Sequence, residues 1–482
     1  MQEIIDNPVL KPELEAGIPE DLRPTKKRIM DPLSYGASFL GGCVSIGTFS
    51  MGASLIGALT IPQAIIAMII GCAVIAVALV LVGNCGHKYG IPYSIQLRSS
   101  FGTAGVKLPG LLRGVPAIIW FGYQSWIGAE AIDNCLKVLF GFSCLPLVYV
   151  LFTALQVGLA IKGFKEIKWL ENISCIFIIA ILIYMLYVVR TQFSTEITSA
   201  FSNIQGTWGL PFWAATTSFL GIYSTMIINA SDYARNLHRK TGPKATGGIY
   251  AVAILPVTLF MGLIGLLVTA ATGNSDPVAV FTSTMDSKFL TVLTLLFIAF
   301  AQVSTNVLNN IVPPAYVLMD SFKLKWAPST IIVGVLSICC CPWLLVTPES
   351  AAGLSLFTRI YSAFLGPIFA VMVVDYYILR RQKLDLNQLY DRQGAFKGVN
   401  LPGIFAVLLG SCCSLFLVDL SWYVSLIPTG LIYYFLMKYM KRAAPFRTGS
   451  IFAEGLFLCG FFLWPYVKIS CRLKWNFSLT CD

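Results

Sequence analysis

Residues 33–59 read LSYGASFLGGCVSIGTFSMGASLIGAL, and no other stretch says as much about the architecture of this chain. The stretch is long enough to cross a bilayer, because a hydrocarbon core of about 30 Å takes about 20 apolar residues in a helix. Three glycines, Gly41, Gly42 and Gly47, gather near its middle. Backbone groups freed by unwinding there must find partners, since lipid offers none. The stretch therefore predicts a membrane helix that is broken near mid-bilayer.

The rest of the 482-residue chain has the composition of a membrane protein. It is 56% hydrophobic and only 12% charged, with a mean hydropathy of +0.75, whereas soluble proteins carry about 25% charged residues. The net charge of +11 lies mostly between apolar runs, where orientation in the membrane explains it better than nucleic-acid binding does. We therefore expect the lipid bilayer, and no nucleic acid, as a partner.

Apolar runs of suitable length predict an all-α polytopic protein with twelve transmembrane helices. The runs lie near residues 33–59, 62–84, 112–138, 145–161, 169–189, 210–231, 245–271, 289–311, 328–346, 353–378, 402–419 and 422–438. A further apolar stretch, 451–469, is interrupted by Glu454, Pro465 and Lys468. This stretch could be a thirteenth span or an interfacial segment, and the sequence leaves both open.

Lysine and arginine residues predict how the spans are oriented. With the N-terminus inside, the inner loops within residues 88–113, 162–168, 235–244, 323–325 and 380–397 carry eighteen of them. The outer side carries three, Lys137, Arg190 and Lys288. Because cytoplasmic loops are enriched in Lys and Arg, we expect a multi-pass protein of the plasma or bacterial inner membrane with a cytoplasmic N-terminus.

A second glycine-containing span, 210–231, lies five helices after the first. It includes Gly221, followed by Tyr223, Ser224 and Thr225. Paired interrupted spans in two halves of a transporter point to its binding site, so this span is predicted to unwind at its glycine as well. Glycine is also common in membrane helices that pack closely, and the spacing alone does not separate the two interpretations.

Polar side chains at the same depth favour a binding site. Trp120 and Gln124 are four residues apart and share one face of span 112–138 near its middle. Ser304 and Thr305 lie similarly deep in span 289–311, followed by Asn306, Asn309 and Asn310. An aromatic face beside an amide suits a flat heterocycle, because the ring stacks while the amide donates and accepts. Hydrogen bonding between helices is the alternative explanation for any single residue.

Other function classes fit the sequence less well. The chain has only two histidines, His87 and His238, and no deep pair of carboxylates, so we expect no enzyme and no cofactor. The G-x-x-x-x-G-K-[ST] loop of an ATP-driven pump is absent from the sequence. A channel would need a continuous polar pore, yet the polar residues at mid-depth are few and clustered. Secondary active transport is the remaining prediction.

Several motifs resemble the nucleobase:cation symporter-1 family, which includes hydantoin, allantoin, uracil and cytosine permeases. They are NCGHKYGIPY (84–93) with RSSFG (98–102) and LPGLLR (108–113), WFGYQ (120–124), STN (304–306) with PPAY (313–316), and FLGP (364–367) with DYYILRR (375–381). The resemblance covers roughly residues 29–440.

The resemblance implies a leucine-transporter-type fold of two inverted five-helix repeats with broken helices 1 and 6. On this basis the chain divides into a cytoplasmic tail (1–30), a first repeat (31–190), a second repeat (205–380), two extra helices (400–440) and a C-terminal tail (441–482). We expect a monomer that takes up a nucleobase, allantoin or hydantoin with a cation by alternating access.

The same resemblance implies roles for particular residues. Trp120 would stack on the substrate ring, while Gln124 and Asn310 would bond its two polar edges. Tyr223 stands where hydantoin transporters of the family carry a second tryptophan, and Ser45 where they carry glutamine, so a different substrate is expected. Phe357 or Thr358 would lie on the outer gate.

The coupling cation implied by the resemblance lies between the first and eighth spans. Its ligands would be the carbonyls of Gly41, Val44 and Ala301 with the hydroxyls of Ser304 and Thr305. Five neutral oxygens suit Na⁺ and need no carboxylate, since helix ends already supply negative dipoles. Some relatives couple to protons, so a proton-coupled permease is the alternative.

Overall fold

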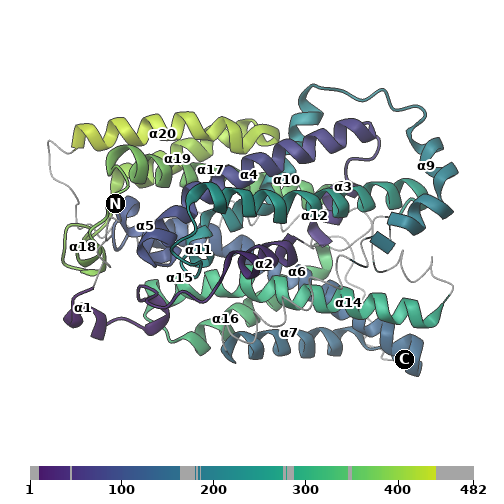
Figure 1. Cartoon of the computed structure of the whole chain (residues 1–482), viewed down its shortest axis with the longest axis horizontal. Coiled ribbons are helices and arrows are strands. Elements are labelled where there is room, and N and C mark those ends of the chain that lie inside the picture. Colours follow the sequence, from purple (N-terminus) through teal and green to yellow (C-terminus); the bar gives the residue numbers. More distant parts are fainter. Residues whose placement is uncertain are drawn as a thin grey trace.

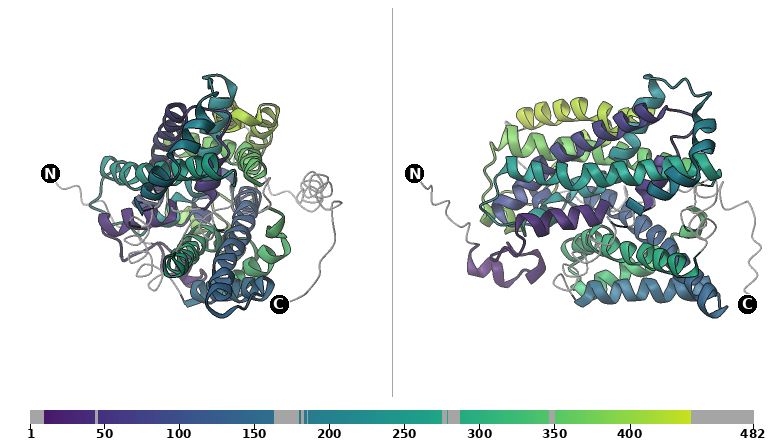
Figure 2. Two further views of the ribbon diagram at one scale, coloured as in Figure 1. Left: turned by 90° about the vertical axis from the view of Figure 1, so that its right-hand side faces the viewer. Right: turned by 45° about the vertical axis from the view of Figure 1, so that its right-hand side comes forward.

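The computed structural model describes residues 10–43, 46–162, 183–184, 186–274, 287–345 and 350–440, with the single residues 180 and 278. Within these residues the regular structure is helical, apart from one isolated bridge between Met30 and Leu237. Most of the long helices run side by side along one direction (Figures 1 and 2). The predicted all-α architecture is therefore confirmed.

Residues 10–162 supply seven of the helices that have described bounds. They are α1 (Pro12–Ala16), α2 (Pro32–Cys43), α3 (Ile46–Ala53), α4 (Ile61–Tyr89), α5 (Tyr93–Phe101), α6 (Lys107–Phe140) and α7 (Leu145–Lys162), with a 3₁₀ turn, η1 (Glu20–Leu22), after α1. Predicted span 169–189 lies mostly outside the described residues. Each of the four predicted spans before it coincides with one of these helices or, for 33–59, with the pair α2 and α3.

The chain after residue 190 continues the same pattern. Its helices are α9 (Ser194–Phe201), α10 (Leu210–Ile228), α11 (Ala230–Ala234), α12 (Pro243–Thr272), α14 (Lys288–Asn306), α15 (Val312–Phe322), α16 (Trp326–Cys339), α17 (Ser350–Val373), α18 (Leu386–Tyr390), α19 (Leu401–Phe416) and α20 (Ser421–Met440). The π-helical turn η2 (Val307–Ile311) joins α14 to α15, and a second one, η4 (Val374–Leu379), follows α17. Two 3₁₀ turns are η3 (Pro342–Leu345) and η5 (Val418–Leu420).

Six helical stretches among the described residues are long and apolar enough to cross a membrane. They are Ile61–Tyr89, Leu145–Lys162, Pro243–Thr272, Lys288–Phe322, Gly353–Leu379 and Val418–Tyr439. Two shorter apolar helices, α16 and α19, accompany them. The chain is thus a multi-pass membrane protein, while the total of twelve spans stays a prediction. The stretch 451–469 lies outside the described residues.

Two described helices, α2 and α3, cover the first predicted span, and the predicted break between them stays a prediction. Asp31 starts α2 by accepting hydrogen bonds from the Ser34 hydroxyl (2.7 Å) and the Ser34 and Leu33 amides (2.9 and 3.0 Å), and these bonds lower the pKa of the Asp31 carboxyl to about 2. The described part of α2 runs to Cys43, and that of α3 starts at Ile46. Residues 44–45 between them lie outside the described part of the chain.

The sixth span is interrupted at a different residue from the one predicted. Gly221 lies inside α10, and the helix ends seven residues later at Ile228, with Asn229 (φ −100°, ψ 22°) before α11. A Cβ at Gly221 would lie 3.0 Å from the carbonyl oxygen of Thr358. The glycine therefore serves the close approach of α10 to α17, which was the alternative interpretation, and the expected unwinding at Gly221 was wrong.

The helices form two neighbouring groups. In one, α10 packs against α4, and α12 packs against α2, α3 and α4; in the other, α6 packs against α7, α14, α15 and α16. Helix α17 contacts both α10 and α6, and α19 and α20 pack beside it. Figure 1 shows α14, α16 and α7 on one side of the molecule and α4, α10 and α20 on the other. The candidate site lies where the two groups meet.

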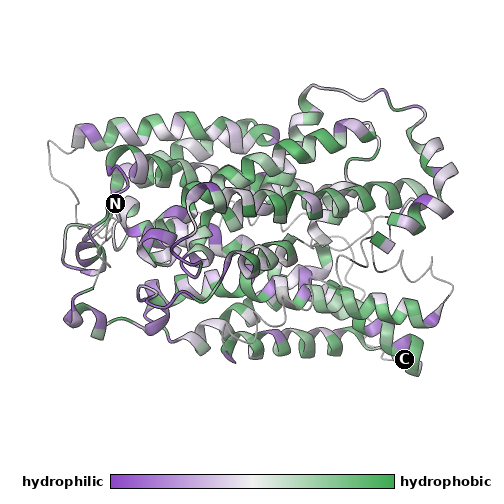
Figure 3. Cartoon of the chain, in the orientation of Figure 1, coloured by the Kyte–Doolittle hydropathy of each residue, from purple (hydrophilic) through white to green (hydrophobic). Residues whose placement is uncertain are grey.

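Polar residues gather at one end of the molecule, where α1 and α18 lie, while apolar residues cover the helices between the ends (Figure 3). At this polar end Arg98 of α5 forms a buried ion pair with Asp320 of α15, and Arg380 pairs with Asp375 (2.7 Å). Elsewhere in the described chain, large apolar side chains such as Val77 and Leu151 face outward. This distribution is the one expected of a protein surrounded by lipid.

Candidate functional site

A small cavity of about 30 Å³ lies where α2, α6, α10, α14 and η2 meet. Its lining residues are Gly42, Trp120, Gln124, Ile222, Tyr223, Thr225, Met226, Thr305, Asn309 and Asn310. This volume is a small fraction of the roughly 300–1,000 Å³ that is usual for pockets binding small organic molecules. Its walls combine two aromatic rings with three amide side chains.

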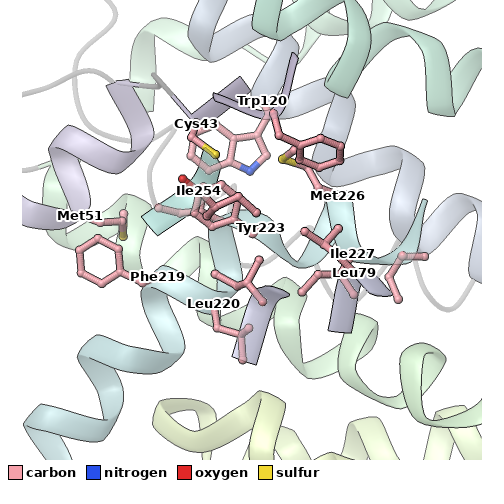
Figure 4. Close-up of a cluster of buried hydrophobic side chains, with 14 of the residues drawn as sticks. Cys43, Met51, Leu79, Trp120, Phe219, Leu220, Tyr223, Met226, Ile227 and Ile254 are labelled. Atoms are coloured by element: carbon pink, nitrogen blue, oxygen red, sulfur yellow. The ribbon is translucent and has the colours of Figure 1, made fainter. Parts of the chain in front are cut away.

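Trp120 is held in place by a tyrosine of another helix. Its indole Nε1 donates to the hydroxyl oxygen of Tyr361 on α17 (3.1 Å), and that hydroxyl donates to the carbonyl of Gly221 on α10 (2.9 Å). Phe357 lies beside the indole, with ring centroids 6.3 Å apart. Figure 4 shows Trp120 in one buried cluster with Tyr223 and Met226. These contacts fix the plane of the indole at the cavity wall.

Tyr223 is almost fully buried, with 1% of its surface exposed. Its hydroxyl shares a hydrogen bond with Thr258 of α12 (2.8 Å) and a longer one with Thr48 of α3 (3.5 Å). Because both hydroxyl partners are protein groups on neighbouring helices, the part of Tyr223 left for the cavity is chiefly its ring.

An amide network joins Gln124 to Asn310. The Asn310 Nδ2 donates to the Gln124 carbonyl oxygen (3.2 Å) and to the Asn306 carbonyl oxygen (2.8 Å). Behind them, the Asn306 amide donates to Gln156 of α7 (3.0 Å). All four amides are at most 4% exposed, and such buried amides are stable only when hydrogen-bonded.

An arginine lies next to this network, away from the cavity lining. Arg113 of α6 is fully buried, and its Nη2 donates to the Asn229 side chain and to the Asn309 backbone carbonyl, each at 2.9 Å. Asn229 in turn donates to Asp232 (3.3 Å), and Tyr233 donates to the Asn309 side chain (2.7 Å). Arg113 therefore connects the interruption of the sixth span with the π-helical turn of the eighth.

The predicted cation ligands fall partly within the described chain. Gly41 lies in α2, and Ala301 and Thr305 are buried on α14, which packs against α2. Val44 and the side chain of Ser304 lie outside the described residues. A Cβ on Gly42 would lie 3.3 Å from the Asn309 Nδ2, so the end of α2 reaches η2. Within the described chain no three acidic, histidine or cysteine residues cluster.

The structure brings together Trp120, Gln124, Tyr223 and Asn310, four of the predicted substrate residues, with Thr305 beside them. Thr358 does not line the cavity; it packs against Gly221 and donates to the Ser355 carbonyl (2.8 Å). Ser45 lies outside the described residues.

Some functional candidates were missed by sequence reasoning. Tyr361, Asn229 and Arg113 act through contacts between distant segments, so their own neighbours in the sequence gave no sign of a role. Gln156 did offer a signal, because it is a lone amide in the apolar run 145–161.

Curated relatives align with this chain over most of their length. The hydantoin permease of Microbacterium maritypicum is 26% identical, covering 87% of this chain and 88% of the relative. The allantoin permease of Bacillus subtilis is 27% identical (87% and 93%), and the putative allantoin permease of Escherichia coli is 28% identical (90% and 97%). These relatives are named permeases, so the expectation that the chain is not an enzyme is confirmed.

Solved structures share the fold. One is a nucleobase-cation-symport-1 family transporter in a closed conformation with bromovinylhydantoin bound, with a TM-score of 0.81 and 24% identity over 90% of this chain and 98% of that chain. An inward-facing structure of the same transporter gives a TM-score of 0.78 at 24% identity over 89% and 96%. The predicted fold class is thereby confirmed.

A sequence model for one family covers nearly all of the helical region. The family is described as permeases for cytosine/purines, uracil, thiamine and allantoin, and its model matches residues 23–440. The resemblance noted from the motifs is confirmed by this match. The chain belongs to this family of membrane permeases.

Proposed function

We propose that this permease is a secondary active symporter that takes up a flat heterocycle of the nucleobase, allantoin or hydantoin class together with Na⁺. The observation that carries the proposal is the shared cavity of Trp120, Gln124, Tyr223 and Asn310 at the meeting point of the two helix groups. Aromatic faces and buried amides are the groups that recognise a flat ring with polar edges. Hydantoin and allantoin, after which two of the relatives are named, belong to the same chemical class.

The size of the cavity supports transport by alternating access. Ligand cavities for small organic molecules measure about 300–1,000 Å³, whereas this one encloses about 30 Å³. A heterocycle must therefore enter a conformation in which the helices around Trp120 and Tyr223 have moved apart. The substrate and the cation each stabilise the conformation in which they make contacts that the other conformations do not offer.

The cation would bind where α2 ends beside α14, at the carbonyls and hydroxyls named above. The last carbonyl groups of a helix have no partners within it and carry a partial negative charge. Thr305, which lines the cavity, would connect this cation to the substrate. We propose the cytoplasmic N-terminus on the distribution of Lys and Arg in the loops.

Uptake into proteoliposomes tests the transport mechanism. Radiolabelled uracil, cytosine, allantoin and hydantoin are supplied with an inward Na⁺ gradient, and choline replaces sodium in the control. Saturable accumulation above the outside concentration is expected only with Na⁺, and accumulation against the substrate gradient excludes a channel. Full uptake in choline that collapses with an uncoupler would overturn Na⁺ coupling in favour of protons.

Binding measurements test the site itself. Trp120→Ala and Gln124→Ala should abolish the thermal shift caused by the heterocycle that binds most tightly. The first variant lacks the indole on which the ring stacks, and the second lacks the amide that bonds the polar edge of the ring. Trp208→Ala is a matched control, since Trp208 is 58% exposed before α10, and it should keep normal binding. Near-normal binding by the Gln124 variant would overturn the proposed site.

A further inference from the structure

Four buried amides form a row that leads from α7 to the cavity. They are Gln156 of α7, Asn306 at the end of α14, Asn310 of η2 and Gln124 of α6. Gln124 and Asn310 line the cavity, but Asn306 and Gln156 do not. A side-chain amide donates through its nitrogen and accepts through its oxygen. The orientation of each amide in the row therefore determines whether the next one must donate or accept.

Gln156 is oriented by a backbone carbonyl. Its Nε2 donates to the Ser125 hydroxyl (2.9 Å) and to the Phe152 carbonyl (3.4 Å). A backbone carbonyl can only accept, so the amide nitrogen must face Phe152. The Gln156 carbonyl oxygen is left to accept from Asn306 (3.0 Å).

Asn306 is oriented independently by a second backbone carbonyl. Its Nδ2 donates to the Phe121 carbonyl (3.2 Å) as well as to Gln156. The reverse orientation would set the Asn306 oxygen against two other carbonyl oxygens in a fully buried position. The Asn306 oxygen therefore faces the other way and accepts from Asn310 (2.8 Å).

Both amide hydrogens of Asn310 are used in hydrogen bonds within the row. They go to the carbonyl oxygens of Asn306 (2.8 Å) and Gln124 (3.2 Å). No described residue donates to the Asn310 oxygen, although Asn310 is 96% buried and lines the cavity. The side chain thus presents an acceptor to whatever occupies the cavity.

We propose that Asn306 and Gln156 are positioning residues that fix Asn310 as a hydrogen-bond acceptor toward the substrate, so that the site selects heterocycles with a ring N–H at that edge. The proposal rests on the proposed function, whose site it deepens. It predicts that lactam and ureide rings such as uracil and hydantoin bind, and that analogues without the N–H at this edge are rejected. A site built around an N–H discriminates strongly against a ligand that lacks it.

The test compares hydantoin and uracil with their N1- and N3-methyl derivatives and with 2,4-oxazolidinedione, in which a ring oxygen replaces the N1–H of hydantoin. Dissociation constants are measured with the full-length purified permease. We expect at least about a tenfold loss for blocking one of the two nitrogens in each ring. Equal binding of all blocked analogues by the unaltered protein would overturn the proposal without any variant.

Variants show whether methylated analogues bind weakly because the N–H is lost or because the added methyl group does not fit. Asn306→Leu removes the acceptor that holds Asn310, and the tenfold ratio should fall to about threefold or less as Asn310 becomes able to turn. An unchanged ratio in Asn306→Leu would mean that crowding explains the selectivity, which overturns the proposal.

Asn400→Leu is the matched control, since Asn400 is 1% exposed and bonds Ser100 and Tyr433 rather than the amide row. It should lower thermal stability and leave the ratio unchanged. If Asn306→Leu does not fold, Gln156→Leu is used, with a smaller fall in the ratio expected. Failure of the unaltered protein to bind any of these rings would instead refute the proposed function.

Discussion

Arg113 donates a hydrogen bond of 2.9 Å to the side-chain oxygen of Asn229, the residue at which the sixth span is interrupted. The same Nη2 atom donates to the Asn309 carbonyl in the π-helical turn of the eighth span. One fully buried cation thus joins the Asn229 side chain at the interruption of the sixth span to the backbone of the π-helical turn in the eighth.

Arg113→Leu should therefore reduce transport more than it reduces folding. The change leaves two buried acceptors unpaired, each costing about 1–3 kcal/mol, while removal of a buried charge offsets part of this cost. We expect the uptake rate to fall more than about tenfold, with a modest fall in melting temperature. Arg190→Leu, at an exposed position, is the control, and normal uptake by the Arg113 variant would contradict the role given to it.

Tyr361→Phe tests whether the orientation of Trp120 matters. The variant keeps the ring but removes the oxygen that accepts from the Trp120 indole and donates to Gly221. A net hydrogen bond contributes about 1 kcal/mol, so affinity for the heterocycle should fall by roughly fivefold. Titration calorimetry measures the change, and Tyr439→Phe, at an outward-facing position 75% exposed, should show none.

Gly221→Ala tests the close approach of α10 to α17. The added Cβ would lie 3.0 Å from the Ser362 hydroxyl and the Thr358 carbonyl, and overpacking of this kind costs about 1–3 kcal/mol. We expect a lower melting temperature and slower uptake. Gly158→Ala provides the comparison, because nothing lies within 4 Å of its Cβ; equal melting temperatures for the two variants would refute the packing argument.

Asp320→Asn tests the buried ion pair between Asp320, whose side chain is 3% exposed, and Arg98, whose side chain is 5% exposed. Removing one partner of a buried pair leaves an uncompensated charge, at a cost of about 3–5 kcal/mol. We expect strong loss of thermal stability and of folded protein in the membrane. Asp419→Asn breaks the pair between Arg359 and Asp419, whose side chains are 19% and 38% exposed. It should cost less than Asp320→Asn, because this pair is less buried. Similar losses for both would contradict this account.

The sequence by itself determined the helical membrane architecture, because long apolar runs have no other stable state in lipid than a helix with its backbone bonds satisfied. It also singled out Trp120, Gln124 and Asn310. A helix places residues four apart on one face, and polar side chains at mid-depth in a membrane are costly unless they are paired or bind a ligand.

Only the tertiary structure decided which of these groups meet and how they are turned. The interruption at Asn229 rather than Gly221, the support of Trp120 by Tyr361, and the amide row from Gln156 to Asn310 all involve contacts between residues far apart in the sequence. Examples are Arg113 with Asn229, Trp120 with Tyr361 and Asn306 with Gln156. Spacing along one helix carries no information about such partners, because packing against other helices determines them.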